Sequence, residues 1–234
     1  MSSRKIAVAT LLSAGLLMAG NASAEVSGSV TVVSDYLFRG VTQTNEEPAL
    51  QAGLTWEHES GFYVGTWGSS ISWLSDSDPD ISSQVELDVF LGYAGEFGDS
   101  GVGYDVGANY YWYPGSYPAG FTDADTLELY LGLSWNMLSA KYSYATTDLF
   151  GIPDSDGSAA LDLDAGWEFD GGWSAGAGYS KQWISGYSGA LDYDYWRLSA
   201  GKSFDNGFGI GVEWHDTDIS GADDTFLVSL SKSF

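Results

Sequence analysis

The residues of this chain that could do chemistry are mostly carboxylates. The sequence contains 32 Asp and Glu against 8 Lys and Arg, which gives a formal net charge of −24, and it has 2 His and no Cys. Without cysteine there is no thiolate nucleophile, zinc–thiolate site or disulfide framework. With so few basic residues the chain cannot neutralise a nucleic-acid backbone. The chemistry to test is therefore a cation site, a histidine-based hydrolytic site or an acidic passage for ions.

A calcium site is the first possibility, because Asp76, Asp78 and Asp80 are spaced like the start of an EF-hand loop. That loop also needs a glycine at its sharp turn and a bidentate glutamate at its end, where this sequence has Ile81 and Leu87. We therefore predict solvated loop charge, with no metal and no cofactor. Divalent cations would still be able to bridge such loops to anionic lipopolysaccharide.

A hydrolytic site is the second possibility, and it depends on His58 or His215. A catalytic triad needs a histidine beside a serine and a third group that orients it. Ser60 is only near His58 in sequence, and Asp216 follows His215 directly, which places the two side chains on opposite faces of a strand. The sequence thus predicts no enzyme. A membrane-embedded lipid hydrolase, with His215 and a cross-strand Asp or Ser, is the weakest alternative.

The elements that must position these residues show alternation of apolar and polar residues. From Leu127 to Trp135, Leu and Trp alternate with Glu, Tyr, Gly and Ser, and residues 85–93 and 161–169 repeat the pattern. Such alternation is typical of a strand with one apolar face. The runs are about ten residues long, enough for a tilted strand to cross a bilayer. We predict about twelve strands, over approximately residues 26–39, 49–58, 62–73, 84–97, 102–112, 126–135, 138–146, 159–169, 173–183, 193–204, 208–216 and 225–234.

The connections and the aromatic residues favour a membrane barrel over a soluble β-sandwich. Tight turns such as Ser60-Gly61 alternate with longer loops such as residues 113–125, which is the asymmetry of outer-membrane barrels. Aromatic residues end most apolar stripes, as Trp135 and Trp167 do, and match two interfacial girdles. The sequence therefore predicts an all-β fold: a transmembrane antiparallel up-and-down β-barrel, with short periplasmic turns and longer extracellular loops.

The two ends of the chain indicate export to the bacterial outer membrane. Arg4 and Lys5 precede an apolar run over residues 6–20 and an A-x-A site at residues 22–24, so residues 1–24 are predicted to be a cleaved signal peptide. Residues 25–234 are then a single barrel domain. The last strand alternates to Phe234, an ending that resembles outer-membrane proteins read by the barrel assembly machinery.

If the apolar faces meet lipid, the residues between them face the lumen. By this parity the acidic candidates are Asp35, Glu57, Glu86, Asp88, Glu96, Asp105, Glu128, Asp162, Asp164, Glu168 and Glu213. The basic candidates are Arg39, Lys141 and Arg197. Carboxylates around a water-filled lumen attract cations. We therefore predict a channel that passes small solutes passively through an acidic, cation-preferring lumen.

A plugged barrel remains the alternative to an open channel. Charged pairs and tyrosines can fill the interior of a small barrel, whose acidic loops would then bind a partner or lipopolysaccharide. Arg39 ends the first predicted strand, four residues after Asp35, and we expect it to pair with a carboxylate and hold that strand to its neighbour.

The chain resembles the TorF-family porins, proteobacterial outer-membrane proteins formerly described as a conserved family of unknown function. The residues that carry the resemblance are Ser34-Asp-Tyr-Leu-Phe-Arg-Gly-Val-Thr-Gln43, Pro48-Ala-Leu-Gln-Ala-Gly53 and Gly61-Phe-Tyr-Val-Gly-Thr-Trp-Gly68. The resemblance covers essentially the whole chain after the predicted signal peptide. It implies an outer-membrane barrel and pore function, and it brings no substrate or catalytic residue.

Overall fold

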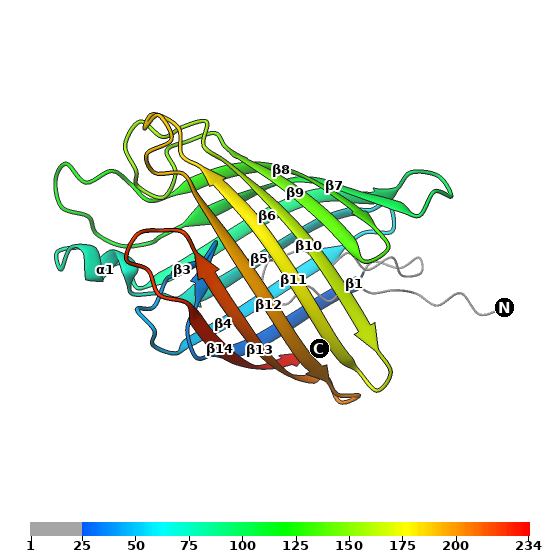
Figure 1. The fold of residues 1–234 in the computed structure, drawn as a ribbon. Helices are drawn as coiled ribbons and strands as arrows, with labels where there is room; N and C mark the ends of the chain where they lie inside the picture. Colours follow the sequence, from blue (N-terminus) through cyan, green and yellow to red (C-terminus); the bar gives the residue numbers. More distant parts are fainter. Residues whose placement is uncertain (1–24) are drawn as a thin grey trace.

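Twelve antiparallel strands close into a barrel in the computed structural model, which describes residues 25–234 (Figure 1). Each barrel strand pairs with its neighbours along the chain, and β14 pairs with β1 to complete the ring. The barrel strands are β1 (Glu25–Val33), β4 (Ala49–Glu57), β5 (Phe62–Ser70), β6 (Val85–Glu96), β7 (Val102–Trp112), β8 (Thr126–Trp135), β9 (Leu138–Ala145), β10 (Ala159–Phe169), β11 (Trp173–Trp183), β12 (Tyr193–Ser203), β13 (Phe208–Thr217) and β14 (Thr225–Ser233). The predicted signal peptide lies outside the described residues.

The predicted fold class and strand number are confirmed, but two predicted strands are too long. The first was expected to continue to residue 39, whereas β1 ends at Val33. The chain there leaves the ladder, and the two short strands β2 (Leu37–Phe38) and β3 (Val41–Thr42) form a separate hairpin. The third was expected to reach residue 73, but β5 ends at Ser70 and the short helix α1 (Trp73–Ser77) follows.

The two ends of the barrel differ. At one end, here called the turn end, the strands are joined by short turns, and the chain enters β1 and leaves β14 (Figure 1). At the other end, the loop end, the connections are residues 34–48, 71–84, 113–125, 146–158, 184–192 and 218–224. α1 and β3 both lie at the loop end, on the left of Figure 1. The predicted alternation of short and long connections is therefore confirmed.

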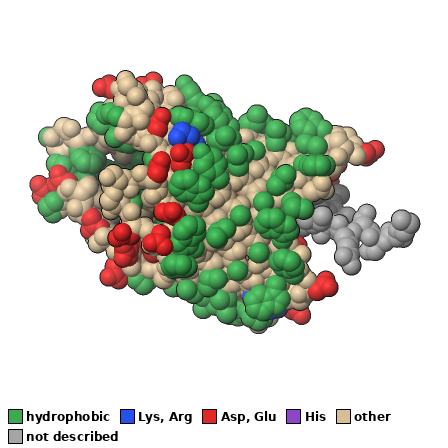
Figure 2. All heavy atoms as spheres, in the orientation of Figure 1, with side chains coloured by type: hydrophobic (Ala, Val, Ile, Leu, Met, Phe, Trp, Pro, Cys, Tyr) green, Lys and Arg blue, Asp and Glu red, His purple; other side chains and the backbone are tan. Residues whose placement is uncertain are grey.

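The outer wall of the barrel is apolar. Val89 and Leu91 on β6, and Leu129 and Leu131 on β8, are each about half exposed. Figure 2 shows hydrophobic side chains over the wall, with most of the visible acidic side chains gathered toward the loop end. Because a lipid-facing surface must be apolar, this wall suits a bilayer. Within residues 25–234, no helix is long and apolar enough to cross a membrane.

Glycine on the inner wall lets large side chains lie flat against it. A Cβ at Gly107 on β7 would overlap the hydroxyl of Tyr130 and the carbonyl oxygen of Leu91. A Cβ at Gly65 on β5 would overlap the ring of Phe90 in the same way. The inward rings of β6 and β8 therefore occupy space that any larger residue on the neighbouring strand would take.

Candidate functional site

The structure places the predicted lumen residues in four settings. Four carboxylates are buried on the inner wall: Glu86, Asp88, Glu128 and Glu213. Five charged residues are half-buried there: Asp105, Lys141, Asp162, Asp164 and Arg197. Three carboxylates lie at the turn end of their strands: Glu57, Glu96 and Glu168. Two residues leave the wall and belong to the loop-end segment between β1 and β4: Asp35 and Arg39.

That segment, residues 34–48, is here called the lumen hairpin. Its turn is Arg39-Gly40, with φ of 47° and 77°, so both central residues are left-handed, as a two-residue type I′ hairpin requires. Asp35 stabilises the hairpin by joining its two arms: its Oδ1 accepts hydrogen bonds from the hydroxyls of Thr42 (2.6 Å) and Thr44 (2.9 Å). The residues that were expected to extend β1 therefore fold back as a small hairpin.

Arg39 reaches across the lumen to the opposite wall. Its Nη1 and Nη2 donate to Oε1 and Oε2 of Glu128 on β8, both at 2.8 Å. Nη1 also donates to Oε1 of Gln182 on β11 at 3.0 Å. The Arg39 and Glu128 side chains are 7% and 3% exposed. The expectation that Arg39 pairs with a carboxylate is confirmed, but the partner is not on a neighbouring strand: the pair spans the barrel.

This ion pair is strong because it is bidentate and buried. Bidentate contacts between a guanidinium and a carboxylate are among the strongest hydrogen bonds in proteins. Burial alone disfavours the charged form of Arg39, but the Glu128 carboxylate outweighs it and raises the pKa of Arg39 well above its usual range. Removing either partner would leave a buried charge without compensation.

Tyrosine hydroxyls donate hydrogen bonds to three of the other six inner-wall carboxylates, Glu86, Asp105 and Asp162. Glu86 accepts hydrogen bonds from Tyr36 (3.0 Å) and Tyr113 (3.2 Å), which belong to two different loop-end segments. Asp162 accepts hydrogen bonds from the hydroxyls of Tyr195 at 2.9 Å and Ser180 at 2.7 Å. Each of these carboxylates thus links two parts of the chain.

Three more tyrosines and two basic residues complete this polar network. Their contacts are a hydrogen bond from Tyr63 to Asp105 (2.6 Å), one from Tyr111 to Glu128 (3.3 Å), an ion pair between Arg197 and Asp164 (2.6 Å), and Lys141 Nζ over the Tyr130 ring (4.4 Å). Tyr63 and Tyr130 also hydrogen-bond to one another. The alternation along the strands would have placed the strand tyrosines and Gln182 on the inner wall, because they alternate with exposed apolar residues. Nothing in the pattern indicates Tyr36 or Tyr113, which lie in loop-end segments.

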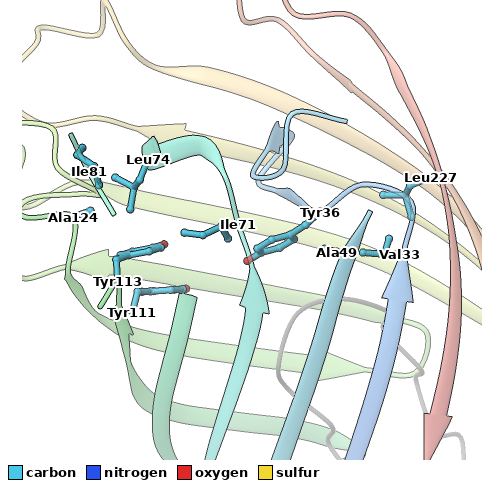
Figure 3. Close-up of a cluster of buried hydrophobic side chains, with 10 residues drawn as sticks. All are labelled: Val33, Tyr36, Ala49, Ile71, Leu74, Ile81, Tyr111, Tyr113, Ala124 and Leu227. Carbon is cyan, nitrogen blue, oxygen red and sulfur yellow. The ribbon is translucent and has the colours of Figure 1, made fainter. Parts of the chain in front are cut away.

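An aromatic cluster fills the loop end above this network. Figure 3 shows Tyr36, Ile71, Tyr111 and Tyr113 converging from three separate segments, with Tyr111 and Tyr113 both at the loop end of β7. The full set of buried members is Val33, Tyr36, Ala49, Ile71, Leu74, Ile81, Tyr111, Tyr113, Ala124 and Leu227. Phe38 at the hairpin packs edge-on against Tyr111 (ring centroids 5.6 Å apart) and Phe150 (5.5 Å). The cluster therefore extends from β14 and β1 on one side of the mouth to β7 and residues 124 and 150 on the other.

Burial shows that the loop-end half of the lumen is packed. Gln51 and Glu86 on the inner wall are each 1% exposed, Thr126 is 0% exposed and Gln182 is 1% exposed. A wide water-filled passage at this level would leave these polar side chains accessible. The turn-end half is different, because its inward positions are mainly Gly and Ser, as at Ser174, Ser199 and Gly201. The described conformation is therefore constricted at the loop end.

The histidines form no triad within residues 25–234. His215 Nε2 lies 2.9 Å from Oε2 of Glu213, and no serine hydroxyl hydrogen-bonds to its ring. His58 Nδ1 lies 2.9 Å from the Ser60 hydroxyl in an exposed turn at the turn end. The same part of the chain contains no group of three or more His, Asp or Glu side chains placed to hold a metal ion.

The fold is that of outer-membrane porins. The KdgM porin superposes with a TM-score of 0.58 at 12% sequence identity, over 89% of this chain and 99% of that one. The NanC porin gives 0.52 at 12% identity, over 89% and 98%. An outer membrane channel from Pseudomonas putida F1 gives 0.50 at 14% identity, over 96% and 100%. At these identities the likeness concerns the fold alone.

The family is defined by sequence. Residues 18–234 match the model described as "Bacterial protein of unknown function (Gcw_chp)", and the chain belongs to this family. No curated protein matches the chain in sequence.

Proposed function

We propose that this protein is an outer-membrane channel through which small solutes diffuse passively, with a lumen that prefers cations. One observation carries the proposal: the inner wall of a porin-like barrel bears a set of carboxylates that outnumbers its basic residues. Two of the three lumen basic residues, Arg39 and Arg197, are neutralised by ion pairs. Carboxylates around a narrow passage lower the energy of a cation and raise that of an anion.

The proposed location and assembly follow from the ends of the chain and the apolar wall. Residues 1–24 would be removed on export, the loop end would face outward, and the wall would contact outer-membrane lipid and lipopolysaccharide. Phe234 would be read by the barrel assembly machinery. Its backbone exchanges hydrogen bonds of 3.0 Å with Gly28 on β1, so the residue belongs to the closing seam. The resemblance to TorF-family porins agrees with this proposal.

The charge of the lumen distinguishes the proposed solutes from polyanions. One similar structure is a KdgM porin in complex with disordered oligogalacturonate, an acidic oligosaccharide. A polyanion entering this lumen would meet Asp105, Asp162 and Asp164 on the half-buried part of the inner wall. Like charges at close range in a confined space repel strongly. We therefore propose cationic and neutral small solutes, and not acidic oligosaccharides.

Liposome swelling tests the proposal. Proteoliposomes containing the mature chain should swell faster in glucosamine, which carries a positive charge, than in galacturonate of similar size. Empty liposomes are the control for leakage. Equal rates, or faster swelling in galacturonate, would refute the cation preference, and no swelling in any sugar would count against the channel.

A plugged surface-interaction barrel is the second candidate, favoured by the packed loop end. The two candidates differ in whether pure, folded protein ever conducts. The hydrolase alternative has no support in the geometry, because the ring of His215 is engaged by Glu213 and not by a serine.

A further inference from the structure

The lumen hairpin is a self-contained unit. Its internal hydrogen bonds join Gln43 N to Tyr36 O (2.7 Å) and Tyr36 N to the Thr44 hydroxyl (3.1 Å). The contacts of Asp35 with Thr42 and Thr44 close the same unit from within. A segment that satisfies its own backbone in this way can keep its fold when it changes position.

Side chains, and not a strand ladder, hold this unit against the barrel wall. Arg39 binds Glu128 and Gln182, and the hydroxyl of Tyr36 binds Glu86. Beyond the root of the hairpin at Ser34, the backbone hydrogen bonds that leave it within the described residues come from Ser72 and Trp73 N to Gln43 O, in another loop-end connection. The barrel strands, in contrast, are joined by continuous ladders.

The turn of the hairpin is strained at the residue that makes the strongest contact. Arg39 has a φ of 47°, in the left-handed region where Asn or Gly is ordinarily preferred at this position of a type I′ turn. Long side chains rarely adopt this conformation, and such strain persists where surrounding contacts enforce it. Here the enforcing contact is the bidentate pair with Glu128.

The barrel does not need the hairpin in order to close. Val33, the last residue of β1, is the direct cross-strand partner of Ala49, the first residue of β4. A two-residue turn could therefore join them, because opposite residues of an antiparallel pair can be connected by a tight hairpin. The fifteen residues between them are thus dispensable for the ladder, although they fill the lumen.

We propose that the lumen hairpin is a displaceable plug and that the ion pair between Arg39 and Glu128 is the latch that holds it across the lumen. This inference rests on the proposed channel function. The described conformation is the closed state. In the open state the latch is broken, the hairpin has swung out of the mouth about its roots at Ser34 and Pro48, and Arg39 is hydrated.

Planar-bilayer recordings of the full mature chain test the plug with three variants. In the first, residues 34–48 are replaced by Asn-Gly. In the second, Glu128→Gln removes the charge of the latch with little change of shape. The third, Asp164→Asn, is the matched control, because it removes the same charge from another inner-wall ion pair, formed between β10 and β12.

We expect the wild type to be closed most of the time and the variant without the hairpin to conduct continuously. Since the latch consists of charge-assisted hydrogen bonds, Glu128→Gln should raise the open probability by about tenfold or more. Asp164→Asn should change the open probability less than about twofold, because an ion pair outside the latch does not hold the hairpin. Heat-modifiable mobility on a denaturing gel establishes that each variant is folded.

Three results would overturn the inference, and they separate it from the channel function. Equal, continuous conductance of the wild type and the variant without the hairpin would mean that the hairpin does not plug the lumen. Equal effects of Glu128→Gln and Asp164→Asn on the open probability would mean that the ion pair between Arg39 and Glu128 is not what holds the hairpin. Silence of every folded variant, including the one without the hairpin, would end the channel function itself.

Discussion

Weakening the latch should loosen the hairpin without loosening the barrel. Glu128 accepts two hydrogen bonds from Arg39, both at 2.8 Å, in surroundings where the two side chains are 7% and 3% exposed. In Glu128→Gln one neutral acceptor remains and the charge is lost. A buried hydrogen bond to a charged group contributes about 1.5–3 kcal/mol, so we expect the free energy of hairpin opening to fall by about 2 kcal/mol.

Hydrogen–deuterium exchange measures that free energy directly. Exchange through opening accelerates about tenfold for each 1.4 kcal/mol, so a loss of about 2 kcal/mol predicts roughly 25-fold faster exchange. The reporters are the amides of Ser72 and Trp73, which donate to Gln43 O and lose this acceptor when the hairpin leaves the lumen, followed in a peptide covering residues 71–78. The hydrogen bonds inside the hairpin are kept when it moves as a unit, so the amides of Tyr36 and Gln43 should exchange at nearly the wild-type rate.

The barrel strands supply the internal control for this experiment. Peptides from β10 and β11, which form a continuous ladder, should exchange at the wild-type rate. A change of less than about threefold in the peptide covering residues 71–78, or equal acceleration in this peptide and in the strands, would refute the reasoning. Either result would mean that the ion pair does not hold the hairpin separately from the barrel.

Three further predictions concern the wall, the lumen and the seam. Gly107→Val should lower the free energy of unfolding by about 1–3 kcal/mol in denaturant titrations, because its side chain would meet the backbone of Leu91. Gly132→Ala is the control, because the atom nearest to its added Cβ is 3.5 Å away. Equal denaturation midpoints for the two variants would contradict the packing at Gly107. Arg197→Gln should increase the permeability of K⁺ relative to Cl⁻ in bilayer recordings, since it leaves Asp164 without its cation, and an unchanged ratio would exclude Arg197 from the conduction path. Deletion of Phe234 should reduce the heat-modifiable fraction of protein in outer membranes severalfold, and a wild-type fraction would show that assembly does not depend on this residue.

The barrel was predictable because lipid imposes a rule that the sequence must follow locally. Each strand crossing the bilayer needs an apolar outer face, so Leu129, Leu131 and Leu133 alternate with Glu128 and its inward neighbours along β8. Alternation of this kind fixes both the strand and the side of each residue. Most strand ends and the inward carboxylates followed from this rule, with errors beyond Val33 and Ser70, where apolar and aromatic residues continue past the wall.

The lumen hairpin was not predictable, because no local rule describes it. Tyr36, Leu37 and Phe38 are strand-forming residues that continue from β1 without a turn signal, and the turn at Arg39-Gly40 carries arginine where Asn or Gly would indicate a type I′ hairpin. The reason for the arginine is Glu128, which lies 89 positions further along the chain. Residues so far apart in the sequence meet only in the closed barrel. The sequence pattern shows which residue types are present and not which of them meet.

The reversal potential of the wild-type channel tests the central claim most directly. With KCl tenfold more concentrated on one side of a planar bilayer, a lumen lined by carboxylates should bring the potential toward the value for K⁺, and higher salt on both sides should weaken the preference because it screens the charges. A reversal potential of the opposite sign, toward the value for Cl⁻, would contradict the account.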